Sequence, residues 1–97
     1  MEACSISISK HAYGRLKERN GWNKKAADRM VTRVYYEGMR PNMIKGYLKS
    51  WVNRKADMYE DDKEFILFGE KLYIFRDGTM LTVLPVPSRS YIINNAV

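Results

Sequence analysis

The only histidine of the chain, His11, lies in a basic stretch whose pattern predicts a helix. Arg15 and Arg19 follow it at intervals of four residues, so on a helix the three side chains lie along one face. An imidazole titrates near neutral pH and can accept a proton, while guanidinium groups bind and neutralise phosphate. These are the groups that RNA cleavage requires. The same pattern is also typical of a solvated basic helix that contains an incidental histidine.

Metal-independent cleavage of RNA needs a base that removes the proton of the 2′-hydroxyl and cations that stabilise charge on the phosphorane. His11 suits the first role, and Arg15 and Arg19 suit the second. Thr82 or Tyr73, both in predicted strands, would orient the phosphate if its side chain pointed toward the first helix. No second obvious proton-transfer group accompanies His11, so an acid would have to be a Glu, Tyr or Lys, or be absent.

A second group of cations favours binding rather than chemistry. Lys25, Arg29 and Arg33 repeat every fourth residue and form a second basic stripe. Lys45 and Lys49 are one turn apart on the outer side of the third predicted helix. Such cations follow a phosphate backbone without reading bases, and a solvated surface is the alternative interpretation.

Aromatic residues near these cations extend the binding hypothesis. Trp22 and Tyr36 are candidates for stacking with unpaired bases, whereas Trp51 and Tyr47 belong to an apolar helical face and are expected in the core. This hypothesis describes a non-enzymatic protein that binds nucleic acid. By analogy alone, a small basic protein of this kind from a mobile element would instead inhibit a host defence nuclease.

The charge of the chain is distributed unevenly. The net charge is +6 over 97 residues, and residues 1–57 carry 13 Lys and Arg against 5 Asp and Glu. Residues 58–97 carry 4 against 6. The basic part is the part predicted to be helical, which favours a polyanionic partner such as RNA. The length and the hydrophobic content of 45% predict one domain, residues 1–97.

Cysteine content and the N-terminal residues bear on location and cofactors. Cys4 is the only cysteine, so no internal disulfide is expected, which suits a reducing cytoplasm. One Cys and one His do not make a zinc site, and we expect neither a metal nor another cofactor. Met1–Cys4 lacks the features of a secretory signal, and the longest apolar stretch, Met80–Pro87, is too short to span a membrane.

The periodicity of apolar residues predicts the elements that position these side chains. Apolar and polar residues alternate up to Ser9, and from there the apolar residues follow the helical period. Ser9 is a suitable N-cap. The alternation returns after an acidic break at Met58–Lys63. Asp77-Gly78 indicates a type I′ hairpin turn. The predicted helices are residues 10–19, 24–37 and 41–56, and the predicted strands are 4–9, 64–68, 72–76 and 79–84. We expect an α+β fold of order β-α-α-α-β-β-β, with three helices packed on one face of a small antiparallel sheet.

The stretch Ile8–Ala12 with Arg15 and Arg19 gives the opening His-Ala-x-x-Arg-x-x-x-Arg. With Lys71–Phe75 and Leu81–Pro85 as a closing hairpin, the chain resembles the RelE-like ribonuclease toxins of the barnase–EndoU–colicin–RelE fold group. It is most similar to members found in phages and mobile elements. The resemblance implies an α+β fold and RNA as the partner, with an antitoxin as a further partner. Members of this group vary in their catalytic residues, and some have none.

A protein–protein module is the third hypothesis. The chain would then be an immunity or inhibitor subunit or a homodimer, and an exposed edge strand near Tyr91–Ile93 would offer its pairing surface. The acidic run Glu60–Asp62 would meet a basic partner, although a solvated loop is the ordinary interpretation of such a run.

Overall fold

The structure is a computed structural model that describes residues 6–87. The elements are β1 (Ser7–Ile8), α1 (Lys10–Asn20), α2 (Lys24–Glu37), η1 (Pro41–Met43, a 3-10 helix), α3 (Tyr47–Ala56), β2 (Glu64–Phe68), β3 (Lys71–Arg76) and β4 (Thr79–Pro85). The order β-α-α-α-β-β-β and the α+β class confirm the prediction. The predicted strand position of Cys4 and the predicted edge strand Tyr91–Ile93 lie outside the described residues.

Local hydrogen bonds fix the ends of the first two helices. Ser9 Oγ accepts from the amide of Ala12 at 3.0 Å, and Asn23 Oδ1 accepts from the amide of Ala26 at 2.8 Å. Each cap supplies an acceptor for an amide that has no partner inside its helix. Gly21 ends α1 with a φ of 71°, which a glycine adopts without steric cost. The cap at Ser9 confirms the prediction from the sequence.

The helix predicted over residues 41–56 is interrupted in the structure. Its first part is η1, and α3 begins only after Gly46, whose φ of 72° breaks the helical backbone. The break lets the chain turn and places Ile44 in the core, where its side chain is 2% exposed. Lys45 therefore lies in the connection, and it does not share a helical face with Lys49 as the sequence predicted.

The four strands form one sheet in the order β1-β4-β3-β2. β2, β3 and β4 pair antiparallel, and the predicted type I′ turn joins β3 to β4 with positive φ at both Asp77 and Gly78. β1 pairs parallel with β4, Ser7 opposite Thr79, so the sheet is mixed rather than antiparallel as expected. An alternating sequence pattern identifies a strand but carries no information on its direction.

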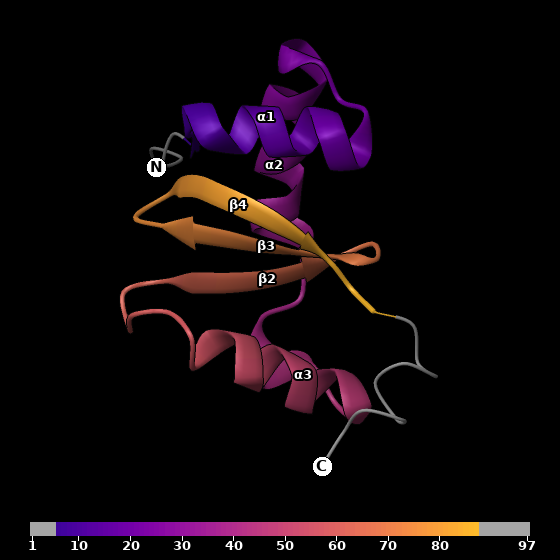
Figure 1. The fold of residues 1–97 in the computed structure, drawn as a ribbon, viewed down its shortest axis with the longest axis vertical. Helices are drawn as coiled ribbons and strands as arrows, with labels where there is room; N and C mark the ends of the chain where they lie inside the picture. Colours follow the sequence, from indigo (N-terminus) through magenta and orange to yellow (C-terminus); the bar gives the residue numbers. More distant parts are fainter. Residues whose placement is uncertain (1–5, 88–97) are drawn as a thin grey trace.

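The helices cover both faces of the sheet, which corrects the prediction that all three lie on one face (Figure 1). On one face the α1 and α2 residues Ala12, Leu16, Ala27, Val31 and Val34 pack on Ile66, Tyr73, Phe75, Met80 and Val83. On the other face Ile44 and the α3 residues Trp51 and Val52 pack on Phe65, Leu67, Leu72 and Ile74. The reason is visible in the continuous apolar runs Phe65–Phe68 and Leu72–Phe75, since a sheet with one solvated face alternates apolar and polar residues.

Gly38→Ala is expected to lower the free energy of unfolding by about 1–3 kcal/mol. A Cβ at this position would overlap Ile66 Cγ2 and lie 2.7 Å from the carbonyl oxygen of Val34. Gly14→Ala is the matched control, because a Cβ there meets no atom within 4 Å and alanine favours the interior of α1 by about 0.5–1 kcal/mol. Urea unfolding of both variants measures the two changes. A Gly38→Ala variant as stable as the wild type would contradict the close packing of α2 on β2.

Candidate nucleic-acid interface

The stripe His11, Arg15 and Arg19 lies on one flank of α1. Ala12 and Leu16 fix the orientation of the helix, because both are fully buried against the sheet. Each stripe residue precedes a position of the buried face, so its side chain lies beside that face. On the other flank the hydroxyl of Tyr13 donates to Asp28 of α2. The stripe is therefore on the flank of α1 that is turned away from α2.

His11 and Arg15 touch within this stripe. Arg15 Nε donates to His11 Nε2 at 3.3 Å, and Arg15 Nη1 forms an exposed ion pair with Glu18 Oε1 at 3.2 Å. A phosphate bound at Arg15 would compete for this guanidinium and release the lone pair of His11 Nε2 for proton transfer. Arg19, also exposed, forms no ion pair with another described residue. The structure thus brings together a base candidate and one of the two cations that the sequence assigned to phosphate, while Arg19 lies one turn beyond Arg15 on the same flank.

Thr82 does not lie with these residues. It is opposite Ile74 in the β3–β4 pair, and Ile74 belongs to the core on the α3 side. Tyr73 points to the α1 side instead, where its hydroxyl oxygen accepts from Asn20 Nδ2 at 3.0 Å. Of the two strand residues considered from the sequence, Tyr73 is the one near the stripe. No sequence pattern indicates this contact, because Asn20 and Tyr73 are 53 positions apart.

The second stripe lies on the outer surface of α2. Lys25 and Arg29 are exposed and form no ion pair with another residue in the range 6–87. Arg33 is held by Glu37, with Nε 2.9 Å from Oε1, and its guanidinium carbon lies 5.9 Å from the centre of the Phe68 ring. These contacts leave the first two cations of the stripe available for phosphate, while the third is oriented toward the sheet.

The remaining predicted binding residues lie elsewhere. Lys45 and Lys49 are exposed on the segment that covers the opposite face of the sheet, so they do not extend the stripe of α2. Trp22, between α1 and α2, packs partly buried against the core of the α1–α2 side. Tyr36 is 55% exposed, and its ring meets that of Tyr35 edge-on at 5.3 Å. Of the α1 stripe, Trp22 shares a hollow of the surface only with Arg19.

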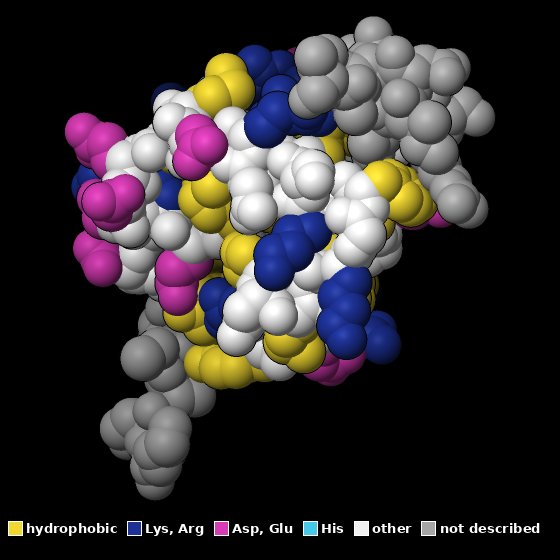
Figure 2. All heavy atoms as spheres, turned by 90° about the horizontal axis from the view of Figure 1, so that it is seen from below, with side chains coloured by type: hydrophobic (Ala, Val, Ile, Leu, Met, Phe, Trp, Pro, Cys, Tyr) yellow, Lys and Arg dark blue, Asp and Glu magenta, His cyan; other side chains and the backbone are white. Residues whose placement is uncertain are grey.

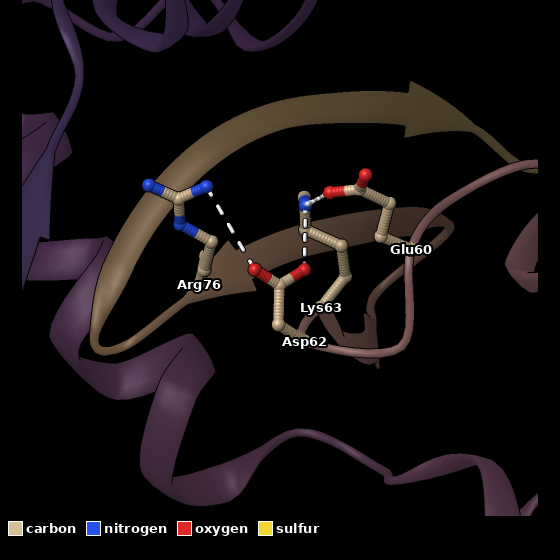
Figure 3. Close-up of polar contacts among 4 residues, drawn as sticks. All are labelled: Glu60, Asp62, Lys63 and Arg76. Atoms are coloured by element: carbon tan, nitrogen blue, oxygen red, sulfur yellow. Dashed lines mark hydrogen bonds and ion pairs between the residues drawn. The ribbon is translucent and has the colours of Figure 1, made fainter.

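Acidic side chains occupy a separate part of the surface. Figure 2 shows the end of the molecule where α3 lies, and the acidic groups gather at its left. In the connection before β2, cations contact two acidic side chains (Figure 3): Lys63 Nζ lies 2.7 Å from Asp62 Oδ1 and 3.7 Å from Glu60 Oε1, and Arg76 reaches Asp62 Oδ2 at 3.8 Å. The hydrogen bond from Lys63 and the nearby charges of Lys63 and Arg76 lower the pKa of Asp62. Local cations therefore offset part of the acidic run.

No group of three His, Cys, Asp or Glu side chains within residues 6–87 is placed to hold a metal ion. Over the same range, every helix is too short or too polar to cross a bilayer. Comparisons with protein-family models, with curated proteins and with solved structures found no match to this chain.

Tyr73→Phe is expected to make stability less sensitive to alkaline pH. Burial raises the pKa of Tyr73 above the ordinary 10.0, and the hydrogen bond from Asn20 offsets this only in part. The neutral phenol therefore stabilises the folded state below pH 10.0, and this contribution is lost as the pH rises through the folded pKa. Urea unfolding between pH 8 and the alkaline limit of folding measures the effect. A parallel loss of stability in wild type and Tyr73→Phe would contradict the assignment.

Proposed function

We propose that this chain is a cytoplasmic RNA-binding protein of the RelE-like fold group, and that the surface of α1 and α2 binds the RNA backbone. Residues 10–37 carry eight Lys and Arg against three Asp and Glu. The observation that carries the proposal is that Arg19, Lys25 and Arg29 are exposed and form no ion pair with a described residue. Binding phosphate then costs no internal ion pair at these positions.

The position of the acidic groups supports the same surface. Glu60, Asp61 and Asp62 precede β2, and Asp62 lies by the β3–β4 turn, where Arg76 contacts it. A polyanion is repelled from this end and attracted to the helices that carry the excess of cations. The partly buried Trp22 at the α1–α2 connection adds an aromatic group suited to unpaired bases, which favours single-stranded RNA over a duplex.

Metal-independent ribonuclease activity is the second candidate function, and the contact between His11 and Arg15 favours it. In this reaction His11 Nε2 takes the 2′-hydroxyl proton of the ribose, the 2′-oxygen attacks the adjacent phosphorus, and the 5′-oxygen leaves. Arg15, which contacts His11, stabilises the charge of the phosphorane, and Arg19 binds a neighbouring phosphate of the same strand. Protonation of the leaving oxygen comes from solvent or from the protonated His11.

Arg29→Gln and Arg19→Gln are expected to weaken binding to a labelled 12-nucleotide oligouridine RNA. Each should reduce the slope of log affinity against log salt by about 0.7, the value for one phosphate contact on a single strand. Lys49→Gln is the matched control, since it removes one exposed cation from α3 and should leave the slope unchanged. Anisotropy titrations over a series of salt concentrations measure all three. If wild type shows no binding, or if Lys49→Gln changes the slope as much as Arg29→Gln, the proposed surface is wrong.

His11→Ala is expected to abolish RNA cleavage while leaving RNA binding within about twofold, because the side chain is exposed and its loss disturbs no core contact. Wild type and variant are incubated with total cellular RNA in the presence of a chelator, and the products are resolved on a denaturing gel. Intact RNA in both samples would reject the ribonuclease while leaving the binding proposal to its own test. Cleavage by both proteins would show that the reaction does not require His11.

A further inference from the structure

An open surface cavity of about 280 Å³ lies where the end of α1 meets the turn between β2 and β3. Its walls include two aromatic rings, two cations and one hydrogen-bonded polar pair, namely Trp22 and Phe68, Arg19 and Lys71, and Asn20 with Tyr73. We propose that this cavity binds the base of one unpaired RNA nucleotide, an inference that rests on the proposed RNA-binding function. Its volume is at the small end of the range for ligand pockets, which suits one nucleotide rather than a longer segment.

The aromatic walls are held in place by the core. Trp22 and Phe68 are partly buried and pack against the same cluster of buried residues, so neither ring has to be ordered when a ligand binds. Arg33 lies over the Phe68 ring at 5.9 Å from its centre and restrains it further. Stacking on such rings accepts every base, because each base has a π face.

The polar pair in the wall has hydrogen-bonding capacity that the protein does not use. Asn20 Nδ2 donates to the Tyr73 hydroxyl oxygen, while Asn20 Oδ1 is buried and accepts no hydrogen bond from the described residues. Within the same range the Tyr73 hydroxyl donates to no acceptor. Either orientation of the Asn20 amide leaves a polar atom of the pair without a partner, and such atoms are rare in folded proteins. Tyr73 lines the cavity, and its hydroxyl can donate to an acceptor on the edge of a base.

The charges around the cavity suit a phosphate on one side of the base. Arg19 is exposed and Lys71 half-buried, and neither forms an ion pair with another residue of the range 6–87. Glu70 is the one carboxylate in the wall, and it lies exposed in the β2–β3 turn. A phosphate is therefore attracted to Arg19 and Lys71 and repelled from the side of Glu70.

The cavity lies at one end of the α1 stripe. Arg19 contributes to both, and His11 is two helical turns away, about 12 Å along the axis at the rise of an α-helix. An RNA strand whose base occupies the cavity can continue past Arg15 toward His11. The bound base then sets which neighbouring phosphate lies beside His11.

The test compares binding of labelled 12-nucleotide oligouridine and oligoadenosine RNA by wild type, Trp22→Leu and Tyr73→Phe. Trp22→Leu should weaken binding about tenfold through lost stacking, and Tyr73→Phe about fivefold through the lost hydroxyl. Both variants should keep the wild-type salt slope, because neither removes a charge. Tyr35→Phe is the matched control: it also loses a phenolic hydroxyl, which donates to Glu64 outside the cavity, and should bind as wild type does. Circular dichroism checks that each variant is folded. If Trp22→Leu does not fold, Tyr73→Phe tests the cavity by itself, because this substitution keeps the buried ring.

The outcomes separate the cavity from the surface around it. Wild-type affinity in folded Trp22→Leu and Tyr73→Phe, with a salt slope that still responds to Arg29→Gln, overturns the base site and leaves the proposed RNA-binding function standing. Weakening in Tyr35→Phe equal to that in Tyr73→Phe also overturns the base site. Absence of RNA binding by wild type overturns both proposals.

Discussion

The strands β2 and β3 bury apolar side chains on both faces of the sheet, and the path of the chain depends on this constraint. After α2 has covered one face, the backbone must pass around the edge of β2 to bring α3 to the other (Figure 1). Met39 and Leu67 exchange two backbone hydrogen bonds of 2.8 Å at that edge, which satisfies part of an otherwise open strand. Gly38 allows the close approach to Ile66, and Gly46 turns the chain into α3.

The charges of the molecule are also separated, but not by the two faces of the sheet. The helices of both faces carry an excess of Lys and Arg, eight against three acidic residues in residues 10–37 and four against none in residues 41–56. The connection before β2 and the β3–β4 turn carry acidic residues that Lys63 and Arg76 partly neutralise. Because Thr82 shares the face of Ile74, it lies on the side of α3, and the α1 stripe has Tyr73 as its neighbour in the sheet. Side-chain alternation along single strands therefore decides which polar groups can act together.

Features with a local cause were predictable from the sequence. Ser9 and Asn23 cap helices by accepting a hydrogen bond from the amide three residues further along the chain. Asp77-Gly78 forms its turn because both residues accept positive φ. The break at Gly46 was missed because the apolar spacing of the third helix continues through it, so Ile44 reaches the core without being helical.

Features that depend on distant contacts were not predictable in the same way. The covered second face had a signal in the uninterrupted apolar runs of β2 and β3, because a strand with one solvated face alternates apolar and polar residues. The direction of β1 had no signal in the sequence. The exposed flank that carries His11, Arg15 and Arg19 follows from helical spacing alone, whereas the contact of Asn20 with Tyr73 joins residues 53 positions apart. No local pattern encodes such a pair.

The helix α1, which carries the stripe, is held to the sheet at both ends, and these attachments affect how the stripe can bind RNA. At its start the Ser9 amide donates to the carbonyl oxygen of Met80 at 3.0 Å, and the Ser9 side chain also caps the helix. At its end Asn20 is bonded to Tyr73 of β3. The two attachments, with Ala12 and Leu16 buried between them, fix the rotation of the helix about its axis. The directions of the three stripe residues are therefore set before any ligand arrives, and binding there loses little conformational entropy beyond that of the long arginine side chains.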